Sequence, residues 1–281
     1  MRRGEGAGLV RTFATALVPA VAGTVALQIR LARRRYRRAM VSAGSIDRTL
    51  LPEDRVFWDG RPLEMVALGD SGMAGVGVSR PDDSLPALIA SRVAAETGRP
   101  VHVVSLGRSG ARTRDVLREQ VPLVTGRPDV VVLLIGTNDV THLSRQGTLS
   151  EDTERLLGHL NGLGVPVVMS SLPEFRAMRA IPPLVRAGLV VKARDVTRVQ
   201  LRAADHARNV RLVDVRQMVG REFVADLSNM STDLFHPSAA GYGRIADALA
   251  PAVTEALLPE AWQTTAARPR PGQVATLEGV A

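Results

Sequence analysis

The stretch EMVALGDSGMAGVG, residues 64–77, decides the fold class of this chain. It begins with a short apolar run that is typical of a buried strand, and it continues into a glycine-rich turn that contains Ser71. Longer stretches with helical periodicity separate this run from four others of its kind. Those four runs lie at residues 101–106, 129–136, 165–171 and 210–215. The alternation predicts a parallel sheet of five strands with helices on both faces.

The composition of the chain agrees with such a sheet. Hydrophobic residues make up 45% of the 281 residues but aromatic residues only 3%, so the core must consist mainly of Val, Leu, Ala and Ile. Aliphatic strands of this kind suit a parallel sheet that is buried on both faces. We therefore expect one α/β domain with three layers, α/β/α, over residues 62–258.

The positive charge of the chain is concentrated at its amino end. The formal net charge is +8, and residues 1–40 account for all of it with nine Arg and one Glu. The remaining residues contain equal numbers of basic and acidic side chains. Binding of nucleic acid needs a basic patch with aromatic residues nearby, and this part of the sequence shows none. We therefore predict no nucleic-acid partner.

Residues that could bind a metal are few. The sequence contains no cysteine, which excludes disulfides, thiolate nucleophiles and cysteine zinc sites. Four of the five histidines, His102, His142, His159 and His206, show no metal-ligand spacing. We therefore expect no metal site.

The amino-terminal region contains an apolar segment flanked by arginines. Residues 12–29 carry no charge, which makes them a candidate membrane span near the short end of the roughly 17 to 25 residues required. An amphipathic surface helix and a signal peptide cleaved near Ala22 are the alternatives. Six Arg in residues 30–38, against three before the apolar segment, place the following domain in the cytoplasm, with export as the alternative. We predict membrane association, a connector at 41–61, and a disordered tail at 259–281.

Capping and stop signals predict several helix boundaries. A helix is expected over 84–98, where Ser begins it and Gly ends it, and another from Thr148, which starts a capping-box sequence. A long helix is expected over 188–208, and the last one begins near Ser238. The proline-containing stretch 172–188 fits no regular element, so we interpret it as a loop over the strand ends.

Three short segments carry the residues of a reactive site. They are LGDSGMAGVG with Ser71, LIGTND with Asn138, and TDLFHPS with Asp233 and His236. Ligands of open parallel sheets bind at the carboxyl ends of the strands, where we expect all three segments to lie. A serine hydroxyl is a weak nucleophile and needs a base, for which His236 is the candidate. Asp233 lies three residues earlier and can accept a hydrogen bond from Nδ1 of that histidine.

A tetrahedral intermediate at Ser71 would need hydrogen-bond donors for its oxyanion. The candidates are the Ser71 N–H, the Gly110 N–H and the side-chain amide of Asn138. Gly110 lies in SLGRSGART after the second strand, where a missing Cβ allows close approach of a substrate. Asp139 is expected to organise this loop from a buried position.

These motifs resemble those of the SGNH or GDSL-type esterases and lipases, in the order of that family over residues 62–256. The residues that carry the resemblance are Gly69-Asp70-Ser71, Gly110, Gly136-Thr137-Asn138-Asp139 and Asp233-x-x-His236. Gly72 stands where the short family signature has Leu, and Ser105 stands near where the second family motif often has Asn.

The resemblance implies a flavodoxin-like fold, no metal or organic cofactor, and hydrolysis of carboxylic esters through an acyl-enzyme. The implied catalytic residues are Ser71, Asp233 and His236, and the implied oxyanion hole is formed by Ser71, Gly110 and Asn138. The expected membrane association suggests acyl-lipid or lipid-like esters as substrates, and O-acetylated carbohydrate is the alternative. A nucleotide-binding module is disfavoured because the glycine-rich turn lacks a P-loop Lys. A membrane-tethered scaffold is disfavoured by the complete set of motif residues.

Overall fold

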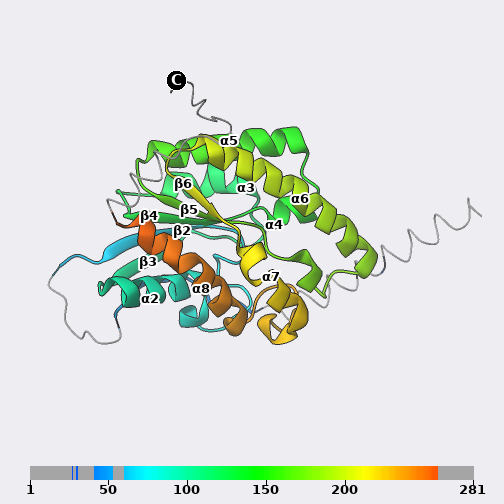
Figure 1. Ribbon diagram of the computed structural model, residues 1–281, viewed down its shortest axis with the longest axis horizontal. Helices are drawn as coiled ribbons and strands as arrows, with labels where there is room; N and C mark the ends of the chain where they lie inside the picture. Colours follow the sequence, from blue (N-terminus) through cyan, green and yellow to red (C-terminus); the bar gives the residue numbers. More distant parts are fainter. Residues whose placement is uncertain (1–26, 28–29, 31–40, 53–59, 259–281) are drawn as a thin grey trace, which may run out of the picture.

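The computed structural model describes Leu27, Arg30 and residues 41–52 and 60–258. A six-stranded sheet with the order β1-β3-β2-β4-β5-β6 forms its centre (Figure 1). The strands are β1 Asp47–Leu50, β2 Leu63–Gly69, β3 Val101–Ser105, β4 Val130–Leu134, β5 Val167–Ser170 and β6 Val210–Val213. Strands β2 to β6 run parallel, and β1 pairs antiparallel with β3. The predicted α/β fold is therefore confirmed.

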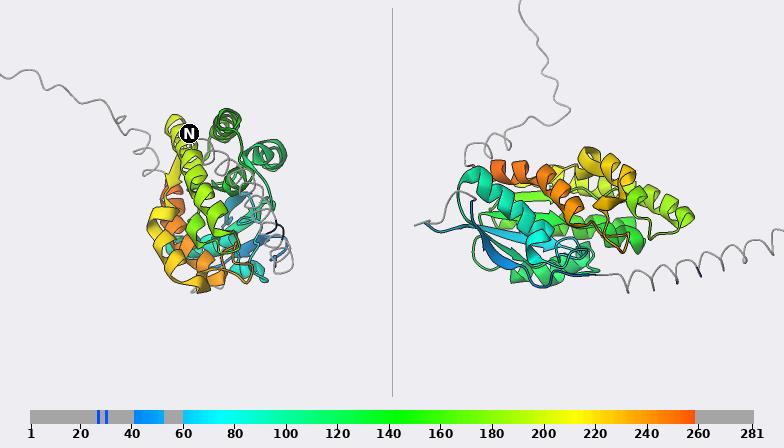
Figure 2. Two further views of the ribbon diagram at one scale, coloured as in Figure 1. Left: turned by 90° about the vertical axis from the view of Figure 1, so that its right-hand side faces the viewer. Right: turned by 90° about the horizontal axis from the view of Figure 1, so that it is seen from below.

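Helices cover both faces of the sheet and give the domain three layers (Figure 2). Helices α2, α7 and α8 lie on one face, and α3, α5 and α6 lie on the other. The helices are α2 Leu85–Thr97, α3 Thr113–Asp115, α4 Thr137–Thr141, α5 Gln146–Gly162, α6 Pro183–His206, α7 Val215–Ala225 and α8 Ala239–Ala256. Short 3-10 turns lie at Pro81–Asp83, Val121–Leu123, Phe175–Ala177 and Leu227–Asn229, and a π-helical turn lies at Val116–Gln120.

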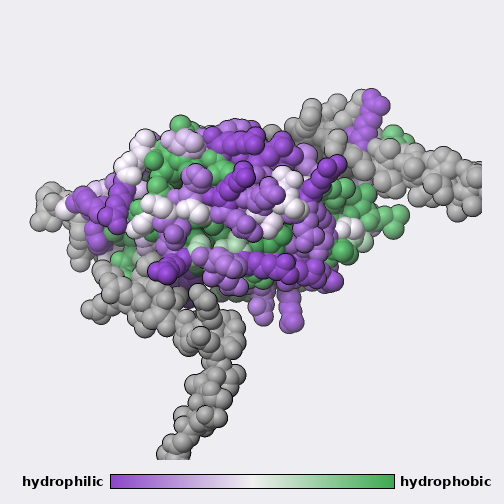
Figure 3. All heavy atoms as spheres, turned by 90° about the horizontal axis from the view of Figure 1, so that it is seen from above, coloured by the Kyte–Doolittle hydropathy of each residue, from purple (hydrophilic) through white to green (hydrophobic). Residues whose placement is uncertain are grey.

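The core consists of aliphatic side chains on both sides of the sheet. Successive strand residues point to opposite faces, so Val132 joins the apolar cluster with α2 and α8 while Leu133 joins the cluster with α5. Both side chains are fully buried. The outer surface above α5 and α6 is mostly hydrophilic, with scattered apolar patches (Figure 3). The buried sheet thus forms a rigid frame for the loops at its carboxyl edge.

One strand lies where the sequence indicates a connector. Strand β1 falls within residues 41–61 and extends the sheet from the five predicted strands to six. Its four residues, DRTL, alternate between exposed and half-buried positions at the edge of the sheet. A strand this short carries too few apolar residues for a periodicity to be seen in the sequence.

Two helices differ from their expected bounds, and a third was not expected. Helix α5 begins at Gln146, ahead of the capping-box sequence at Thr148. Helix α6 begins at Pro183, so its first turns occupy part of the predicted loop at 172–188. Proline is favourable in the first turn of a helix because its missing N–H would have no partner there. Helix α7 was not predicted, although six of its eleven residues, VRQMVGREFVA, are apolar.

The predicted membrane location is corrected by the structure. Within the described part of the chain, no helix is both long enough and apolar enough to span a membrane. The apolar segment 12–29 lies outside the described residues except for Leu27, and the tail 259–281 lies outside them entirely.

Candidate active site

The structure joins Ser71, His236 and Asp233 in one hydrogen-bonded chain. The Ser71 Oγ lies 2.8 Å from Nε2 of His236, and Nδ1 of that histidine lies 2.7 Å from Oδ2 of Asp233. All three residues are buried, with exposed fractions of 6%, 3% and 4% for Ser71, His236 and Asp233. With its proton on Nδ1, the imidazole donates to Asp233 and accepts from the Ser71 hydroxyl. This is the geometry in which a histidine can remove a proton from a serine.

The turn after β2 positions Ser71. Gly69, the last residue of β2, has a φ of +149°, and a Cβ added there would lie 2.0 Å from the carbonyl oxygen of Leu134. Its N–H donates to Oε1 of Gln120, and its carbonyl oxygen accepts from Nε2 of the same side chain. Asp70 N–H donates to Leu134 O on the neighbouring strand β4. The turn is therefore held from both sides just before the serine.

A tight turn before α8 positions the histidine and the aspartate. Oδ1 of Asp233 accepts from the hydroxyl of Ser231 and from the backbone N–H groups of Phe235 and His236. Ser238 then caps α8, since its side chain accepts from the N–H of Gly241. Asp-x-x-His spacing thus folds into a turn in which the carboxylate binds the backbone through one oxygen and the imidazole through the other.

The same contacts determine the ionisation of Asp233. Burial favours the neutral carboxyl group, but the hydrogen bond from His236, its charge, and the backbone N–H groups of His236 and Phe235 outweigh burial. The pKa of Asp233 is therefore lowered from its ordinary value. A carboxylate that stays charged can stabilise an imidazolium on its neighbour.

The predicted oxyanion donors lie on adjacent loops. No described residue accepts a hydrogen bond from the N–H of Ser71 or of Gly110. Gly110 is exposed, with a φ of +83°. The side-chain amide of Asn138 donates to the carbonyl oxygen of Ala111 at 3.0 Å, which places it beside the residue that follows Gly110. One N–H of that amide remains for another acceptor.

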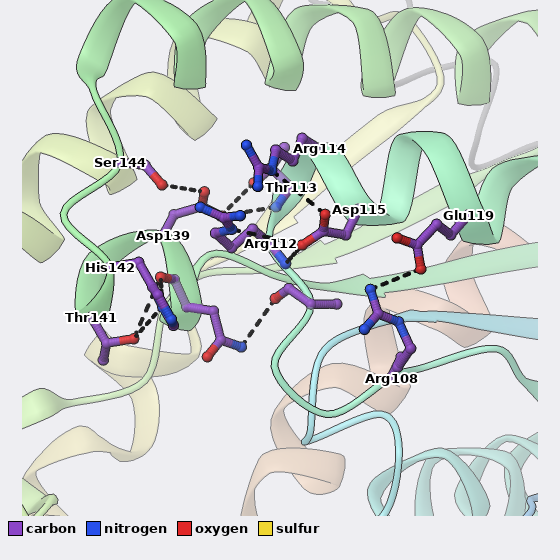
Figure 4. Close-up of polar contacts among 12 residues, drawn as sticks. Arg108, Arg112, Thr113, Arg114, Asp115, Glu119, Asp139, Thr141, His142 and Ser144 are labelled. Carbon is purple, nitrogen blue, oxygen red and sulfur yellow. Dashed lines mark hydrogen bonds and ion pairs between the residues drawn. The ribbon is translucent and has the colours of Figure 1, made fainter.

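Asp139 organises the loop beside Asn138, as predicted. Its Oδ2 accepts from the N–H and the hydroxyl of Thr113, and its Oδ1 accepts from the hydroxyl of Ser144 (Figure 4). Asp139 is 3% exposed, so these donors replace the water that its carboxylate loses. The loops after β3 and β4 are thereby joined at the place where the predicted oxyanion donors lie.

Asp70 is a buried carboxyl group whose burial and ionisation could not be predicted from the sequence. Its Oδ1 accepts from the N–H of Gly72, while its Oδ2 has no hydrogen-bond partner in the described structure. Burial raises its pKa to about 6, against the opposing effects of Gly72 and of the charge on His236. The residue next to Ser71 therefore titrates near neutral pH.

An apolar cavity of about 60 Å³ adjoins Ser71 and His236. Its wall comes mainly from the loop after β5, from α7 and from α8. The apolar residues around it include Met178, Val219, Phe223, Met230, Phe235 and Ile245. Sequence analysis did not find this wall, because α7 was not predicted. No group of His, Asp and Glu residues suited to a metal ion is found in the part of the chain that the structure describes.

A Ser-His-Asp chain at the carboxyl edge of an α/β/α sheet is an arrangement used by serine hydrolases. The model of the GDSL-like Lipase/Acylhydrolase family matches residues 67–244, which is more than half of the chain. The chain therefore belongs to this family.

Similar proteins agree with this assignment. The GDSL-like esterase Rv1075c of Mycobacterium tuberculosis is 30% identical over 198 residues, which cover 69% of this chain and 63% of that protein. The matched region thus spans less than two thirds of that relative. The structure of LAE5, an α/β hydrolase from the metagenome of Lake Arreo, covers 70% of this chain and 96% of its own, with 22% identity and a TM-score of 0.55. The structure of TesA covers 69% and 99%, with 22% identity and a TM-score of 0.54. These two likenesses concern the fold alone.

Proposed function

We propose that this protein hydrolyses carboxylic esters through an acyl-enzyme. The observation that supports this most is the unbroken hydrogen-bonded chain from Ser71 through His236 to Asp233. In the proposed reaction, the Ser71 Oγ attacks the ester carbonyl carbon while Nε2 of His236 takes the hydroxyl proton. The imidazolium that forms is stabilised by Asp233 and then donates its proton to the leaving alcohol.

Deacylation repeats these steps with water. His236 takes a proton from a water molecule that attacks the acyl carbon, and the proton returns to the Ser71 Oγ as the acid leaves. In both steps, the N–H groups of Ser71 and Gly110 and the amide of Asn138 are proposed to bind the oxyanion. Loss of one such donor costs about 3 kcal/mol of transition-state stabilisation in comparable sites.

The apolar cavity favours an aliphatic acyl group in the substrate. Side chains such as Val219, Phe223 and Ile245 can contact a hydrocarbon chain but offer no hydrogen bonds to a sugar. The volume of about 60 Å³ has room for only a few heavy atoms, so we propose that short acyl chains fit better than the long chains of lipids. Acetylated carbohydrate would place its hydroxyl groups against these apolar side chains.

Hydrolysis of para-nitrophenyl acetate, butyrate, octanoate and palmitate by the wild type and by Ser71→Ala tests this function. We expect hydrolysis by the wild type, with kcat/KM highest for the short acyl chains, and no hydrolysis above background by the variant. Equal rates for the two proteins would contradict the serine mechanism. Activity on acetate and acetylated sugars alone would replace the aliphatic substrate with carbohydrate, and a maximum at palmitate would replace it with lipid.

A further inference from the structure

A groove lined by four arginines lies next to the apolar cavity. Its volume is about 440 Å³, and Arg176, Arg194, Arg198 and Arg216 line it. These arginines come from three elements: the 3-10 turn after β5, helix α6 and the first turn of α7. Arginines that serve only to hydrate the surface of one helix need not meet those of other elements. Here arginines of three elements line the same groove.

The arginines of this groove exceed the carboxylates that could balance them. Arg176 binds Glu174 through two hydrogen bonds, of 3.0 and 2.9 Å, and Arg198 binds Asp195 at 2.7 Å. Arg194 and Arg216 form no ion pair with any residue that the structure describes. Two of the four arginines that line the groove therefore have no carboxylate in an ion pair.

Glu174 balances only part of this positive charge. Burial favours its neutral form, but the hydrogen bonds and charge of Arg176, with a smaller effect from the charge of Arg216, outweigh burial and lower the pKa of Glu174. It is therefore ionised at neutral pH, and its hydrogen bonds go to Arg176. Like charges brought together repel one another, so the free arginines of the groove would be stabilised by a bound anion.

The groove adjoins the cavity beside Ser71. Pro173, Glu174 and Arg216 line both spaces, so a substrate bound at Ser71 would lie close to the arginines of the groove. Arg216 is the second residue of α7, and its backbone N–H donates to the hydroxyl oxygen of Ser171, the residue that follows β5. This hydrogen bond holds the backbone of Arg216 beside the carboxyl end of β5.

We propose that this groove binds a phosphate group carried by the ester substrate, with Arg194 and Arg216 as its main contacts. This inference rests on the proposed function, because it assigns the substrate class of the same site. The planar guanidinium group forms paired hydrogen bonds with phosphate oxygens, and two such groups suit a phosphate that carries up to two negative charges. The substrate class is a short-chain acyl ester of a phosphorylated alcohol.

A pair of esters that differ only in the phosphate tests the proposal. Monobutyrylglycerol and monobutyrylglycerol phosphate release the same acid, which can be followed by titration at constant pH. We expect the wild type to have a kcat/KM about tenfold higher for the phosphate ester, and the preference to fall as salt is raised. The double variant Arg194→Gln/Arg216→Gln should lose the preference. The control Arg208→Gln removes an exposed arginine between α6 and β6 and should retain it.

Binding of inorganic phosphate provides a readout that does not depend on hydrolysis. Phosphate should raise the thermal unfolding temperature of the wild type and of Arg208→Gln, compared with chloride at equal ionic strength, but not that of the double variant. Equal ester preference in the wild type and the double variant would overturn the proposal. Phosphate binding without a preference for the phosphate ester would also overturn it, and would indicate a site for the free anion. If no ester is hydrolysed but phosphate still binds through these arginines, the proposed function fails while the anion site remains.

Discussion

Replacing Asp233 by Asn should disable the reaction while leaving the fold intact. In the structure, Oδ1 of Asp233 accepts three hydrogen bonds, from Ser231 and from the N–H groups of Phe235 and His236. The amide oxygen of Asn must take this place, because an NH₂ group there would face two backbone donors. The NH₂ group then lies where Oδ2 was, 2.7 Å from Nδ1 of His236.

That orientation imposes the wrong tautomer on the histidine. The amide donates to Nδ1, so the imidazole proton moves to Nε2, which faces the Ser71 hydroxyl at 2.8 Å and can no longer accept its proton. In a triad with this change, kcat falls about 10⁴-fold, which corresponds to about 5.5 kcal/mol in the barrier. Steady-state hydrolysis of para-nitrophenyl butyrate, with Ser71→Ala as the background, measures the fall.

Asp139→Asn is the matched control. Asp139 is equally buried and accepts hydrogen bonds from Thr113 and Ser144, but no hydrogen bond joins it to His236. This variant can disturb the loop without changing the tautomer of the histidine, and we expect it to lose far less activity. A fall of less than about tenfold in a folded Asp233→Asn variant, or equal falls in both variants, would refute the reasoning.

Three further predictions follow from the site. Burial raises the pKa of Asp70 from 3.8 to about 6, so the wild type should lose stability as pH rises through this interval. The variant Asp70→Asn has no carboxyl group to ionise and should not show this loss. Urea unfolding above this interval should therefore find the variant more stable than the wild type by up to about 3 kcal/mol. Gly69→Ala places a Cβ 2.0 Å from Leu134 O and should lower the free energy of unfolding by about 3 kcal/mol or more, whereas Gly158→Ala, with open space in α5, should raise it by about 0.5–1 kcal/mol. Val219→Trp fills the apolar cavity and should lower kcat/KM for butyrate more than for acetate; equal falls would show that the acyl chain lies elsewhere.

Local signals predicted part of the fold from the sequence alone. Helix α2 ends at Thr97 because Gly98 adopts a φ of +64°, and α8 begins after the capping side chain of Ser238. Both signals act within one helical turn, so they can be read without knowing the rest of the fold. Pro183 was predicted to lie in a loop but begins α6, because a proline that ends one helix can equally begin another.

Features that depend on distant residues could not be predicted in this way. Gln120 binds Gly69 across 51 positions of the sequence, and no motif indicates that contact. The raised pKa of Asp70 results from burial, which only the packed structure defines. The arginine groove likewise requires α6 and α7 to pack against the same turn, Phe175–Ala177. The motif residues themselves were predictable, since each follows or precedes an element with legible boundaries.

Covalent labelling of Ser71 tests the central claim most directly. The full chain is treated with a fluorophosphonate, and its mass and the modified peptide are determined by mass spectrometry. The account predicts one adduct, on Ser71, that is absent from Ser71→Ala and forms much more slowly in His236→Ala, because the hydroxyl then lacks its base. An unlabelled wild type, or an adduct on another residue, would contradict the account.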